Sequence, residues 1–361
     1  MKTIVSVCSA RPNFVKLAAV HHALMGSGIS AKHVIVHTGQ HYDPLFSDIF
    51  FEQLSIPTPD VNLGVKGGER AQVIRETEWA CARAFDDIRP DIVLVYGDVN
   101  GAVGAANAAK RSKIPIGHVE AGLRSFDLTM PEEGNRIAVD RIADLLLCSE
   151  PSGVSNLKKE RAPGAAQLVG NTMIDTLIRM QPQIEVAEIP ADLPDTYAIV
   201  TLHRPSNTDD PAMLRLNVET LTELSERIPL LLPLHHRFRA ALEREGLLAD
   251  LDRAVTLLPA LGYLPFLRLL SASRFILTDS GGVQEEATFL RKRCFTLRKN
   301  TERPITIESG SNILTDLQKL SDRQMLLSAA DTKGQPRITV PVLWDGKAGE
   351  RIVEVISSYL A

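Results

Sequence analysis

The residue types that acid–base chemistry needs gather in one stretch of the first half of the chain. Glu120 directly follows an apolar run, and Pro131 opens a segment that predicts a helix. That helix would carry Glu132, Arg136 and Asp140 four residues apart on one face. Carboxylates gathered in this way can remove and return a proton. The structural alternative is a surface ion pair between Glu132 and Arg136, worth roughly 0.3 kcal/mol.

Charged residues also mark two other strand ends in this half. Asp98 comes after the apolar run 91–96, so it would share the carboxyl edge of a parallel sheet with the glutamate after the next strand. Arg11 and Lys16 lie near the start of a helix predicted over 13–25. Cationic side chains and free backbone N–H groups there can hold an anion. A solvated basic turn is the structural alternative.

The second half carries a glycine turn suited to a diphosphate. Ser280, Gly281 and Gly282 follow the predicted strand 275–278 and precede a helix that contains Glu286. Glycines let backbone N–H groups approach an anion, and the helix N-terminus adds positive potential. Glu286 could accept hydrogen bonds from ribose hydroxyls. The alternative is a left-handed glycine turn that binds nothing.

Histidines end two further strands of the second half. His203 follows the run 198–202, and His235 follows the run 230–234. A single histidine at a strand end is more often a packed, hydrogen-bonded residue than a catalyst. Arginines stand close to both histidines, which modestly favours a catalytic role over simple packing.

Length and composition fit two ordinary domains and disfavour several classes of protein. The chain has 361 residues, of which 44% are hydrophobic, and a formal net charge of −4, which argues against non-specific nucleic-acid binding. We expect a cytoplasmic protein, because the sequence shows no secretory signal and no apolar run of the ~20 residues that a membrane span needs. Paired cysteines and an HExxH motif are absent, so no metal site is predicted. Gly97, Gly101 and Gly104 do not have the spacing of a dinucleotide fingerprint.

Short apolar runs alternate with helical patterns throughout, which predicts an α/β protein with parallel sheets. The predicted strands cover 3–7, 33–37, 91–96, 114–119, 145–148, 198–202, 230–234, 275–278 and 294–297. Prolines at 182, 190 and 194 indicate a surface connection over 181–195, close to a domain boundary.

An ordered set of short motifs resembles the non-hydrolysing UDP-N-acetylglucosamine 2-epimerases. In chain order the motifs are ARPNFVK, HTGQHYD, YGD, GHVEAGLRS, PEEGNR, LHRPSN, DSGGVQEE and TERP, followed by LWDGKA near the C-terminus. Each motif alone carries little information, but the ordered set from Arg11 to Pro304 is highly specific.

The resemblance implies two Rossmann-like domains that face each other across a cleft, the glycosyltransferase-B architecture. We assign 1–170 to an N-terminal domain with the catalytic carboxylates and 171–345 to a UDP-binding domain. The remaining residues, 346–361, would form a helix that packs back on the first domain. The resemblance further implies a cytoplasmic homodimer that makes UDP-N-acetylmannosamine for surface polysaccharides and needs no cofactor.

The family reaction is a reversible epimerisation at C2 of UDP-N-acetylglucosamine. UDP and the C2 proton leave to give 2-acetamidoglucal, and UDP adds back while C2 is reprotonated on its other face. By motif match the catalytic residues are Asp98, Glu120, Glu132, Arg136 and His203. The substrate and UDP contacts would be Arg11, Lys16, His235, Phe266, Ser280, Gly281, Gly282, Glu286 and Arg303, with Phe266 stacked on uracil. The residues alone do not assign the base and the acid.

Two positions depart from the usual family pattern. Val99-Asn100-Gly101-Ala102 replaces hydroxyl-bearing residues after Asp98, which leaves open a related UDP-2-acetamido sugar such as a diacetamido-uronate. Asp43 stands three residues after Gln40, where some members have a second glutamine that serves an activating ligand. This difference argues against allosteric activation. A hydrolysing epimerase that releases UDP and N-acetylmannosamine is a further alternative. A glycosyltransferase or a nucleotide-sugar sensor would not need all of the carboxylates in the first half.

Overall fold

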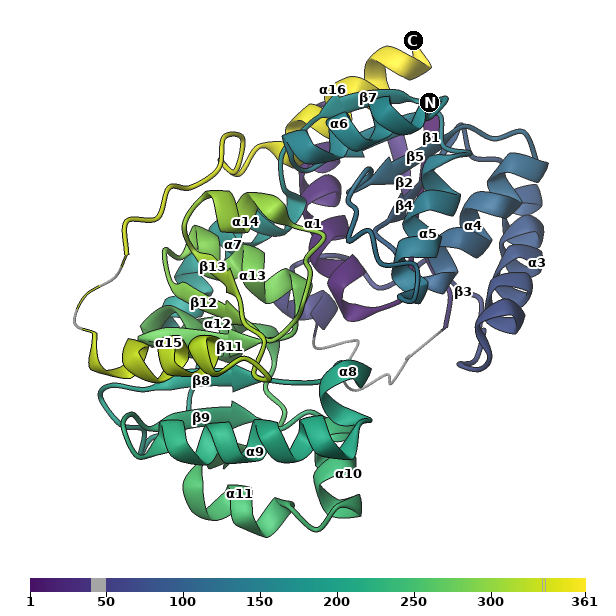
Figure 1. Cartoon of the computed structure of the whole chain (residues 1–361). Helices are drawn as coiled ribbons and strands as arrows, with labels where there is room; N and C mark the ends of the chain where they lie inside the picture. The colour runs from purple at the N-terminus through teal and green to yellow at the C-terminus, as the bar shows by residue number, and fades with distance from the viewer. Residues whose placement is uncertain (40–49, 333, 335) are drawn as a thin grey trace. The chain divides into compact units, whose positions relative to one another are not determined.

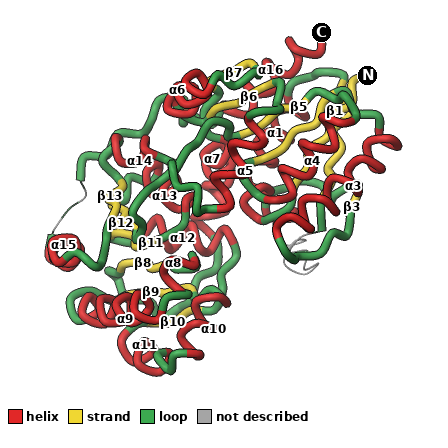
Figure 2. Tube along the Cα trace, turned by 45° about the vertical axis from the view of Figure 1, so that its right-hand side comes forward, coloured by secondary structure: helices red, strands yellow, loops and turns green. Residues whose placement is uncertain are grey.

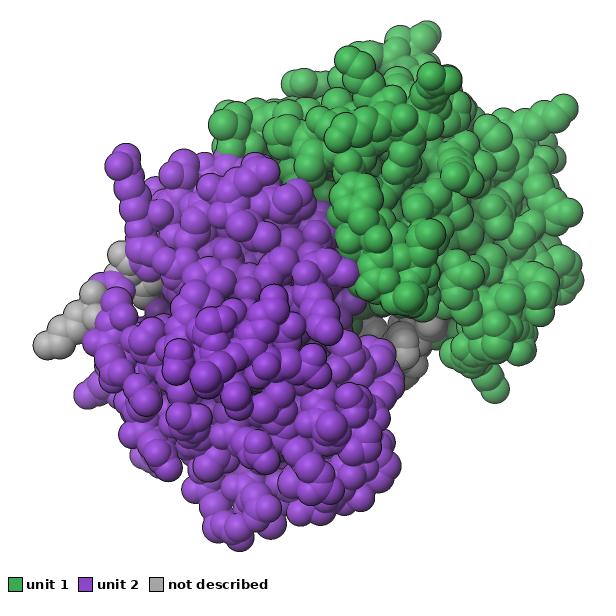
Figure 3. Space-filling view, in the orientation of Figure 1, with its two compact units in different colours: residues 1–180, 342–361 green, residues 181–341 purple. Residues whose placement is uncertain are grey.

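The apolar runs of the sequence form two parallel β-sheets, each within its own unit of the chain (Figure 1). The computed structural model describes residues 1–39, 50–332, 334 and 336–361, so the segment 40–43 discussed above lies outside the described residues. Unit 1 consists of Met1–Met180 and Val342–Ala361, and unit 2 of Gln181–Pro341 (Figure 3).

Unit 1 contains a seven-stranded parallel sheet. In spatial order its strands are β3 (Val61–Asn62), β2 (Ala31–His37), β1 (Lys2–Cys8), β4 (Ile92–Tyr96), β5 (Ile116–Val119), β6 (Leu145–Cys148) and β7 (Ala165–Leu168). In the centre of the sheet Val5 lies opposite Val34 on one side and Val93 on the other. These valines belong to one buried cluster on the same face of the sheet. Near-continuous apolar strands of this kind are typical of a parallel sheet covered on both faces.

Helices cover both faces of this sheet (Figures 1 and 2). They are α1 (Arg11–Gly26), α3 (Arg70–Ile88), α4 (Asn100–Arg111), α5 (Pro131–Asp140), α6 (Pro151–Glu160), the first part of α7 (Thr172–Val186) and α16 (Ala348–Leu360). The small residues of α4 allow close packing against α3, since a Cβ added at Gly104 would lie 2.6 Å from Cβ of Thr77. Likewise, a Cβ at Gly349 of α16 would lie 2.4 Å from the carbonyl oxygen of Ala19 in α1.

Unit 2 contains a six-stranded parallel sheet. Its strands, in spatial order, are β10 (Thr256–Leu258), β9 (Leu230–Pro233), β8 (Ala198–Thr201), β11 (Phe275–Thr278), β12 (Arg293–Thr296) and β13 (Asn312–Leu314). Its helices are α8 (Pro205–Thr208), α9 (Pro211–Ser225), α10 (His236–Arg244), α11 (Leu248–Ala254), α12 (Tyr263–Ala272), α13 (Gly281–Phe289), α14 (Pro304–Glu308) and α15 (Leu320–Asp331). The two buried clusters of this unit contain alternate residues of the same strands, so both faces of the sheet are covered.

The boundary between the units falls inside α7. The sequence analysis divides the chain at residues 170 and 345, and the units of the structure meet at 180 and 341. The surface connection predicted over 181–195 begins as helix, because α7 runs past Pro182 to Val186. Ile184 is buried, so the apolar face of the helix continues beyond the proline. No helix in the described ranges combines the length and apolar character of a membrane span.

Candidate active site

The carboxyl edge of the unit 1 sheet carries an aspartate that is held by a buried arginine. Asp98 follows β4, and its side chain is 25% exposed. Arg136 of α5, whose side chain is 2% exposed, pairs with Asp98 through Nη1. Nη2 of the same guanidinium lies 2.8 Å from Oε2 of Glu133. Arg136 therefore fixes the Asp98 carboxylate at the sheet edge, while Glu133 balances part of its charge.

Glu133 is a buried anchor that the sequence analysis missed. Its carboxylate accepts hydrogen bonds from the backbone N–H groups of Ser125, at 2.9 Å, and Phe126, at 3.0 Å. Burial would raise the pKa of Glu133, but the Ser125 N–H, Arg136 and the Phe126 N–H lower it below its ordinary value. Glu133 thus ties the loop before α5 to the helix. Spacing could not separate it from Glu132, because both lie within one turn of Arg136.

Glu132 lies at the more open side of the same helical turn and is half-buried. Its carboxylate forms no hydrogen bond or ion pair with any residue in the described part of the chain. The surface ion pair with Arg136 that the spacing allowed is therefore not formed. This carboxylate remains available to a ligand.

Glu120 has a backbone conformation that is uncommon for a residue with a side chain. Its φ is +72°, in the left-handed region, which costs of the order of 1 kcal/mol outside glycine. Its N–H and that of Ala121 both donate to the Leu147 carbonyl, at 2.9 and 3.2 Å. Its carboxylate, 6% exposed, pairs with Nζ of Lys16. Backbone strain of this kind clusters at functional sites, so it supports a role for Glu120 beyond folding.

Lys16 is buried in α1, where the sequence analysis expected a cation near the helix start. Its ammonium group compensates the charge of Glu120. The close approach also explains Gly97 at the end of β4. Gly97 has a φ of +63°, and an added Cβ would lie 3.0 Å from Nζ of Lys16.

A buried hydrogen-bond network joins the turns that carry the two strand-end carboxylates. Asp140 Oδ1 lies 2.7 Å from Nδ1 of His118, and Nε2 of His118 lies 2.9 Å from the carbonyl oxygen of Gly97. Asp140 Oδ2 accepts from the Gly122 N–H at 3.1 Å and from Nη1 of Arg124 at 2.8 Å. Burial would raise the pKa of Asp140, but His118 and Arg124 outweigh it and lower that pKa. The network therefore fixes the two turns relative to each other.

The first helix begins two residues earlier than predicted, at Arg11. Asn13 causes the early start, because its Oδ1 accepts hydrogen bonds at 3.1 Å from the backbone N–H groups of Ser9 and Ala10. Arg11 is exposed in the first turn, and its guanidinium carbon lies 5.5 Å from the centre of the Phe50 ring. The cation thus stands at the helix N-terminus, where the sequence analysis expected anion binding.

In unit 2, His203 at the carboxyl end of β8 is held by a buried aspartate. Nδ1 of His203 lies 2.9 Å from Oδ1 of Asp279, which follows β11. The carboxylate also accepts from the N–H groups of His203 and Arg204 and from Nδ2 of Asn207. Burial would raise the pKa of Asp279, but His203 and these donors lower it. The sequence analysis recorded Asp279 as part of the glycine turn and missed this contact.

The glycine turn lies where the sequence analysis expected it, at the start of α13. Ser280 precedes the helix, and Gly281 and Gly282 occupy its first turn. A Cβ added at Gly281 would lie 2.7 Å from both Nη1 of Arg303 and Oε1 of Glu302. Glycine is therefore required here by close contact with buried charged side chains. The first-turn N–H groups of α13 provide the anion-binding geometry that the sequence predicts.

A cluster of buried charges lies against this turn. Its buried members are Arg298, Arg303, Glu285 and Glu302, and Arg204, whose side chain is 20% exposed, lies with Nη2 4.0 Å from Oε1 of Glu302. Arg303 Nε lies 2.8 Å from Oε2 of Glu285, and Arg303 Nη1 lies 2.5 Å from Oε1 of Glu302. Arg298 Nη2 lies 2.7 Å from Oε2 of Glu302. Three guanidinium groups meet two carboxylates in this cluster, and the Asp279 carboxylate lies beside Arg204 at the start of the same turn, so the anion-binding capacity comes from the first-turn N–H groups of α13.

Glu286 is buried in α13 beside Glu285. Burial and the neighbouring Glu285 raise the pKa of Glu286 to about 8, although the hydroxyl of Tyr263 acts in the opposite direction. Phe266 of α12 is half-buried and packs against one of the core clusters. His235 is exposed, and its ring centre lies 5.4 Å from that of His203. The second histidine thus neighbours the first at the same sheet edge.

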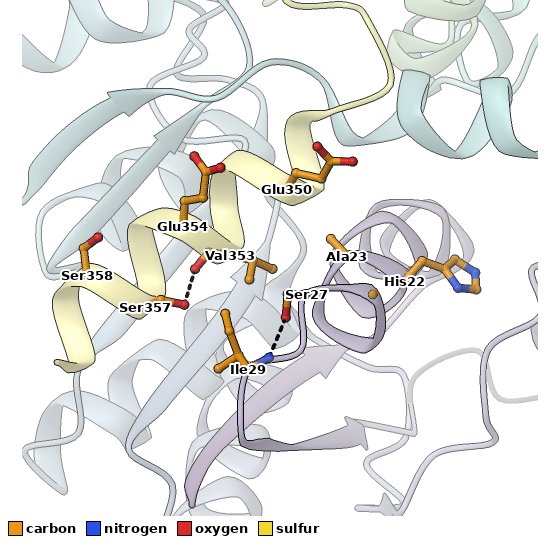
Figure 4. Close-up of a pocket in the computed structure, with 10 residues that line it drawn as sticks. His22, Ala23, Ser27, Ile29, Glu350, Val353, Glu354, Ser357 and Ser358 are labelled. Atoms are coloured by element: carbon orange, nitrogen blue, oxygen red, sulfur yellow. Dashed lines mark hydrogen bonds between the residues drawn. The ribbon is translucent and has the colours of Figure 1, made fainter.

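The predicted site residues lie at the carboxyl edges of the two sheets or in the helices that follow, where parallel sheets usually bind ligands. Within the described ranges, no group of three or more histidine, cysteine or carboxylate side chains could hold a metal ion. A cavity of about 580 Å³ in unit 1 lies elsewhere, near the C-terminal end of α1 and along α16 (Figure 4). Figure 4 shows His22, Glu350 and Glu354 around it, and it contains none of the predicted site residues.

Comparison with known proteins links the whole chain to one family. The sequence profile described as UDP-N-acetylglucosamine 2-epimerase matches residues 27–357. A UDP-2,3-diacetamido-2,3-dideoxy-D-glucuronate 2-epimerase of Pseudomonas aeruginosa is 38% identical over 98% of this chain and 99% of its own. A UDP-N-acetylglucosamine 2-epimerase of Methanocaldococcus jannaschii is 34% identical over 97% of this chain and 98% of its own. A crystal structure of the M. jannaschii enzyme with UDP-GlcNAc and UDP has a TM-score of 0.87 at 33% identity and covers 99% of this chain and all of that one.

Proposed function

Since the chain belongs to the UDP-N-acetylglucosamine 2-epimerase family, we propose that it interconverts UDP-N-acetylglucosamine and UDP-N-acetylmannosamine. The observation that carries the proposal is the group of carboxylates at one sheet edge. Asp98 is held by Arg136, Glu120 is strained and paired with Lys16, and Glu132 is open to a ligand. A protein that only binds a nucleotide sugar would not need three such groups.

The chemistry of the sugar requires groups on both faces of C2. The C2 hydrogen is weakly acidic, so removing it alone at neutral pH is difficult. In the reaction that we propose, a base takes the C2 proton while the C1–O bond breaks and UDP leaves with the electron pair. The product is 2-acetamidoglucal, with a C1=C2 double bond. An acid then protonates C2 on the other face, and a phosphate oxygen of UDP re-forms the bond to C1.

Unit 1 supplies the proton transfers in this proposal. Asp98, Glu120 and Glu132 act as the bases and acids, and Arg136 orients Asp98. Preorganised groups of this kind cost no reorganisation during the reaction. The buried partners of Asp98 and Glu120 favour such preorganisation.

Unit 2 binds UDP in this proposal. Ser280, Gly281 and Gly282 contact the diphosphate, with His235 and Arg303 as further contacts, and the family resemblance assigns Arg11 and Lys16 of unit 1 to the same ligand. Glu286 holds the ribose, Phe266 stacks on the uracil, and His203 assists the departure of the diphosphate. The first-turn N–H groups of α13, with Arg303 close to Gly281, support this assignment.

A related substrate is the second candidate. The P. aeruginosa relative named for a diacetamido-glucuronate is 38% identical, against 34% for the M. jannaschii UDP-N-acetylglucosamine enzyme. In the divergent segment after Asp98, Asn100 Oδ1 accepts from Nδ2 of Asn135 at 2.9 Å, so this amide is already engaged with α5. Parallel assays with both UDP-sugars separate the two candidates.

Proton NMR of UDP-N-acetylglucosamine incubated with the enzyme in D2O tests the proposal. We expect UDP-N-acetylmannosamine to appear with deuterium at C2. Free N-acetylmannosamine with UDP would indicate a hydrolysing enzyme instead. Glu120→Gln and Glu132→Gln should nearly abolish turnover while UDP affinity is retained, and full activity in both variants would refute the assignment of the carboxylates.

The remaining features of the proposal concern context. We propose a cytoplasmic homodimer that works without a cofactor and supplies an activated sugar for surface polysaccharides. Size-exclusion chromatography with light scattering tests the oligomeric state. Dialysis against a chelator, which should leave turnover unchanged, tests independence from metal ions.

A further inference from the structure

We propose that Asp279 is a positioning residue that fixes which ring nitrogen of His203 faces the substrate. The inference rests on the proposed function, because it gives His203 a defined task in the departure of UDP. It concerns a contact within unit 2 only, between the end of β8 and the turn after β11.

Every group that approaches the Asp279 carboxylate is a donor. Oδ1 faces Nδ1 of His203 at 2.9 Å. Oδ2 accepts from the Arg204 N–H at 2.9 Å and from Nδ2 of Asn207 at 3.0 Å. Asp279 is fully buried, and such a set of donors stabilises its charged form. An ionised carboxylate can only accept, so Nδ1 of His203 must carry its proton toward Asp279.

The consequence is a fixed tautomer. When the imidazole is neutral, Nδ1 carries the hydrogen and Nε2 keeps a lone pair. The His203 side chain is 38% exposed, whereas Asp279 is not exposed at all. Nε2 is therefore the ring nitrogen left for a ligand. The same turn that carries Asp279 continues into Ser280 and Gly281, which we assign to the diphosphate.

This arrangement gives a balanced proton transfer. In the forward direction, Nε2–H of the imidazolium donates its proton to a β-phosphate oxygen while the C1–O bond breaks and UDP takes the electron pair. The neutral ring keeps its Nδ1–H hydrogen bond to Asp279. In the return direction Nε2 takes the proton back as the phosphate oxygen attacks C1. Asp279 stays ionised throughout and does not accept the proton.

An asparagine at this position has a predictable orientation. Oδ2 of Asp279 faces three donors, the backbone N–H groups of His203 and Arg204 and the Asn207 amide. The amide oxygen of the variant must take that place, which turns its NH2 group toward Nδ1 of His203. Nδ1 then has to accept, and the hydrogen of the neutral ring moves to Nε2. The variant keeps the shape of the side chain and reverses the tautomer.

The first measurement uses 15N NMR of the full-length protein labelled at histidine. The His203 signals are assigned by their loss in His203→Gln. In the wild type we expect Nδ1 protonated and Nε2 unprotonated in the neutral ring. In Asp279→Asn we expect the reverse. An Nε2–H tautomer in the wild type would overturn the proposal, and this result requires only that the assignment variant His203→Gln folds.

The second measurement compares kinetics with a matched control. Asp279→Asn should lower kcat at least about a hundredfold and leave the UDP dissociation constant within about threefold, because its NH2 group faces Nδ1 and disfavours the imidazolium that protonates the leaving phosphate. Asn207→Ala removes a donor to the same carboxylate but leaves the His203 contact in place. If both variants lower kcat by the same factor and the melting temperature by the same amount, the role of Asp279 is only structural and the proposal is wrong.

The two measurements separate this proposal from the proposed function. Absence of epimerisation by the wild type would contradict the function, and the tautomer would still be measurable. A normal epimerase with an active Asp279→Asn variant would contradict the positioning role alone.

Discussion

The substitution Glu286→Gln tests the proposed ribose contact, because UDP binding should release a proton from the Glu286 carboxyl group. Glu286 is buried in α13, and burial together with Glu285 raises its pKa to about 8. At pH 7 the free protein should therefore hold this proton in roughly nine-tenths of the molecules. A ribose diol offers two O–H donors, which pair best with an ionised carboxylate. UDP binding should then release the carboxyl proton of Glu286, and a glutamine at this position has no titratable proton to release.

The size of the effect follows from that pKa. If only the ionised form of Glu286 binds ribose well, its ionised fraction rises from about 0.01 at pH 6 to about 0.5 at pH 8. UDP affinity of the wild type should therefore increase roughly fiftyfold over this range relative to Glu286→Gln. At pH 8 the variant should bind more weakly, by about 1–2 kcal/mol, because a charge-assisted hydrogen bond is replaced by a neutral one.

Isothermal titration calorimetry measures the proton directly. UDP is titrated at pH 7 in buffers with different heats of ionisation, and the slope gives the number of protons released. We expect the wild type to release about 0.9 proton more than Glu286→Gln. The ionisation of UDP itself cancels in this difference. Glu308→Gln, at an exposed position of α14, serves as the control and should match the wild type.

The same group predicts a pH dependence of folding. Because the folded pKa of Glu286 lies above its ordinary value, its contribution to stability is full below about pH 4.5 and is lost as the pH rises through 8. A shift from 4.5 to about 8 sets a ceiling of about 5 kcal/mol on this loss. Urea unfolding at pH 5 and pH 9 should show this loss in the free energy of unfolding of the wild type at the higher pH, and Glu286→Gln should lack it. Equal proton release and equal pH slopes in the two proteins would refute this account of Glu286.

Three further predictions concern other buried groups. Asp140→Asn leaves Arg124 without part of its compensation, and we expect a loss of about 3 kcal/mol in the free energy of urea unfolding. Gly281→Ala places a carbon 2.7 Å from Nη1 of Arg303, so calorimetry should show UDP binding at least about tenfold weaker, with a stability loss of about 1–3 kcal/mol. Burial lowers the pKa of His33 to about 3, below its ordinary value, so its neutral form contributes stability that is lost as the pH falls from about 6.5 toward 3. His33→Gln should be less sensitive to acid than the wild type when unfolding is compared at pH 4 and pH 7.

The sequence predicts the centre of each sheet and misses its edges. Each of the nine predicted strands corresponds to an interior strand, and within the described ranges the four strands that were not predicted are β3, β7, β10 and β13. All four lie at sheet edges. They are two to four residues long, and most of their residues are partly or fully exposed. An interior strand of a parallel sheet is buried on both faces and produces an apolar run, whereas a short edge strand does not.

The strand ends were enough to locate the candidate site, but they did not identify the buried residues that hold its side chains. Polar residues after apolar runs lead to Asp98, Glu120 and His203, because parallel strands end at one edge. Their buried partners, such as Glu133 and Asp279, could not be found in this way. A glutamate in a helix has the same sequence signal whether it faces water or a buried arginine, since adjacent residues differ only in the face that tertiary packing selects.

The two sheet edges share one arrangement of charge. In unit 1 the partly exposed Asp98 is held by Arg136, whose side chain is 2% exposed. In unit 2 the partly exposed His203 is held by Asp279, which is fully buried. Removing Arg136 leaves the buried Glu133 carboxylate without its cation, and removing Asp279 leaves the Arg204 N–H and the Asn207 amide without their acceptor, so both changes should affect folding and activity together. Removing Asp98 or His203 should affect activity first, because the buried partner keeps its other contacts: Glu133 for Arg136, and the Arg204 and Asn207 donors for Asp279. Comparing the two kinds of substitution in each unit therefore separates the groups that act on substrate from the groups that hold them.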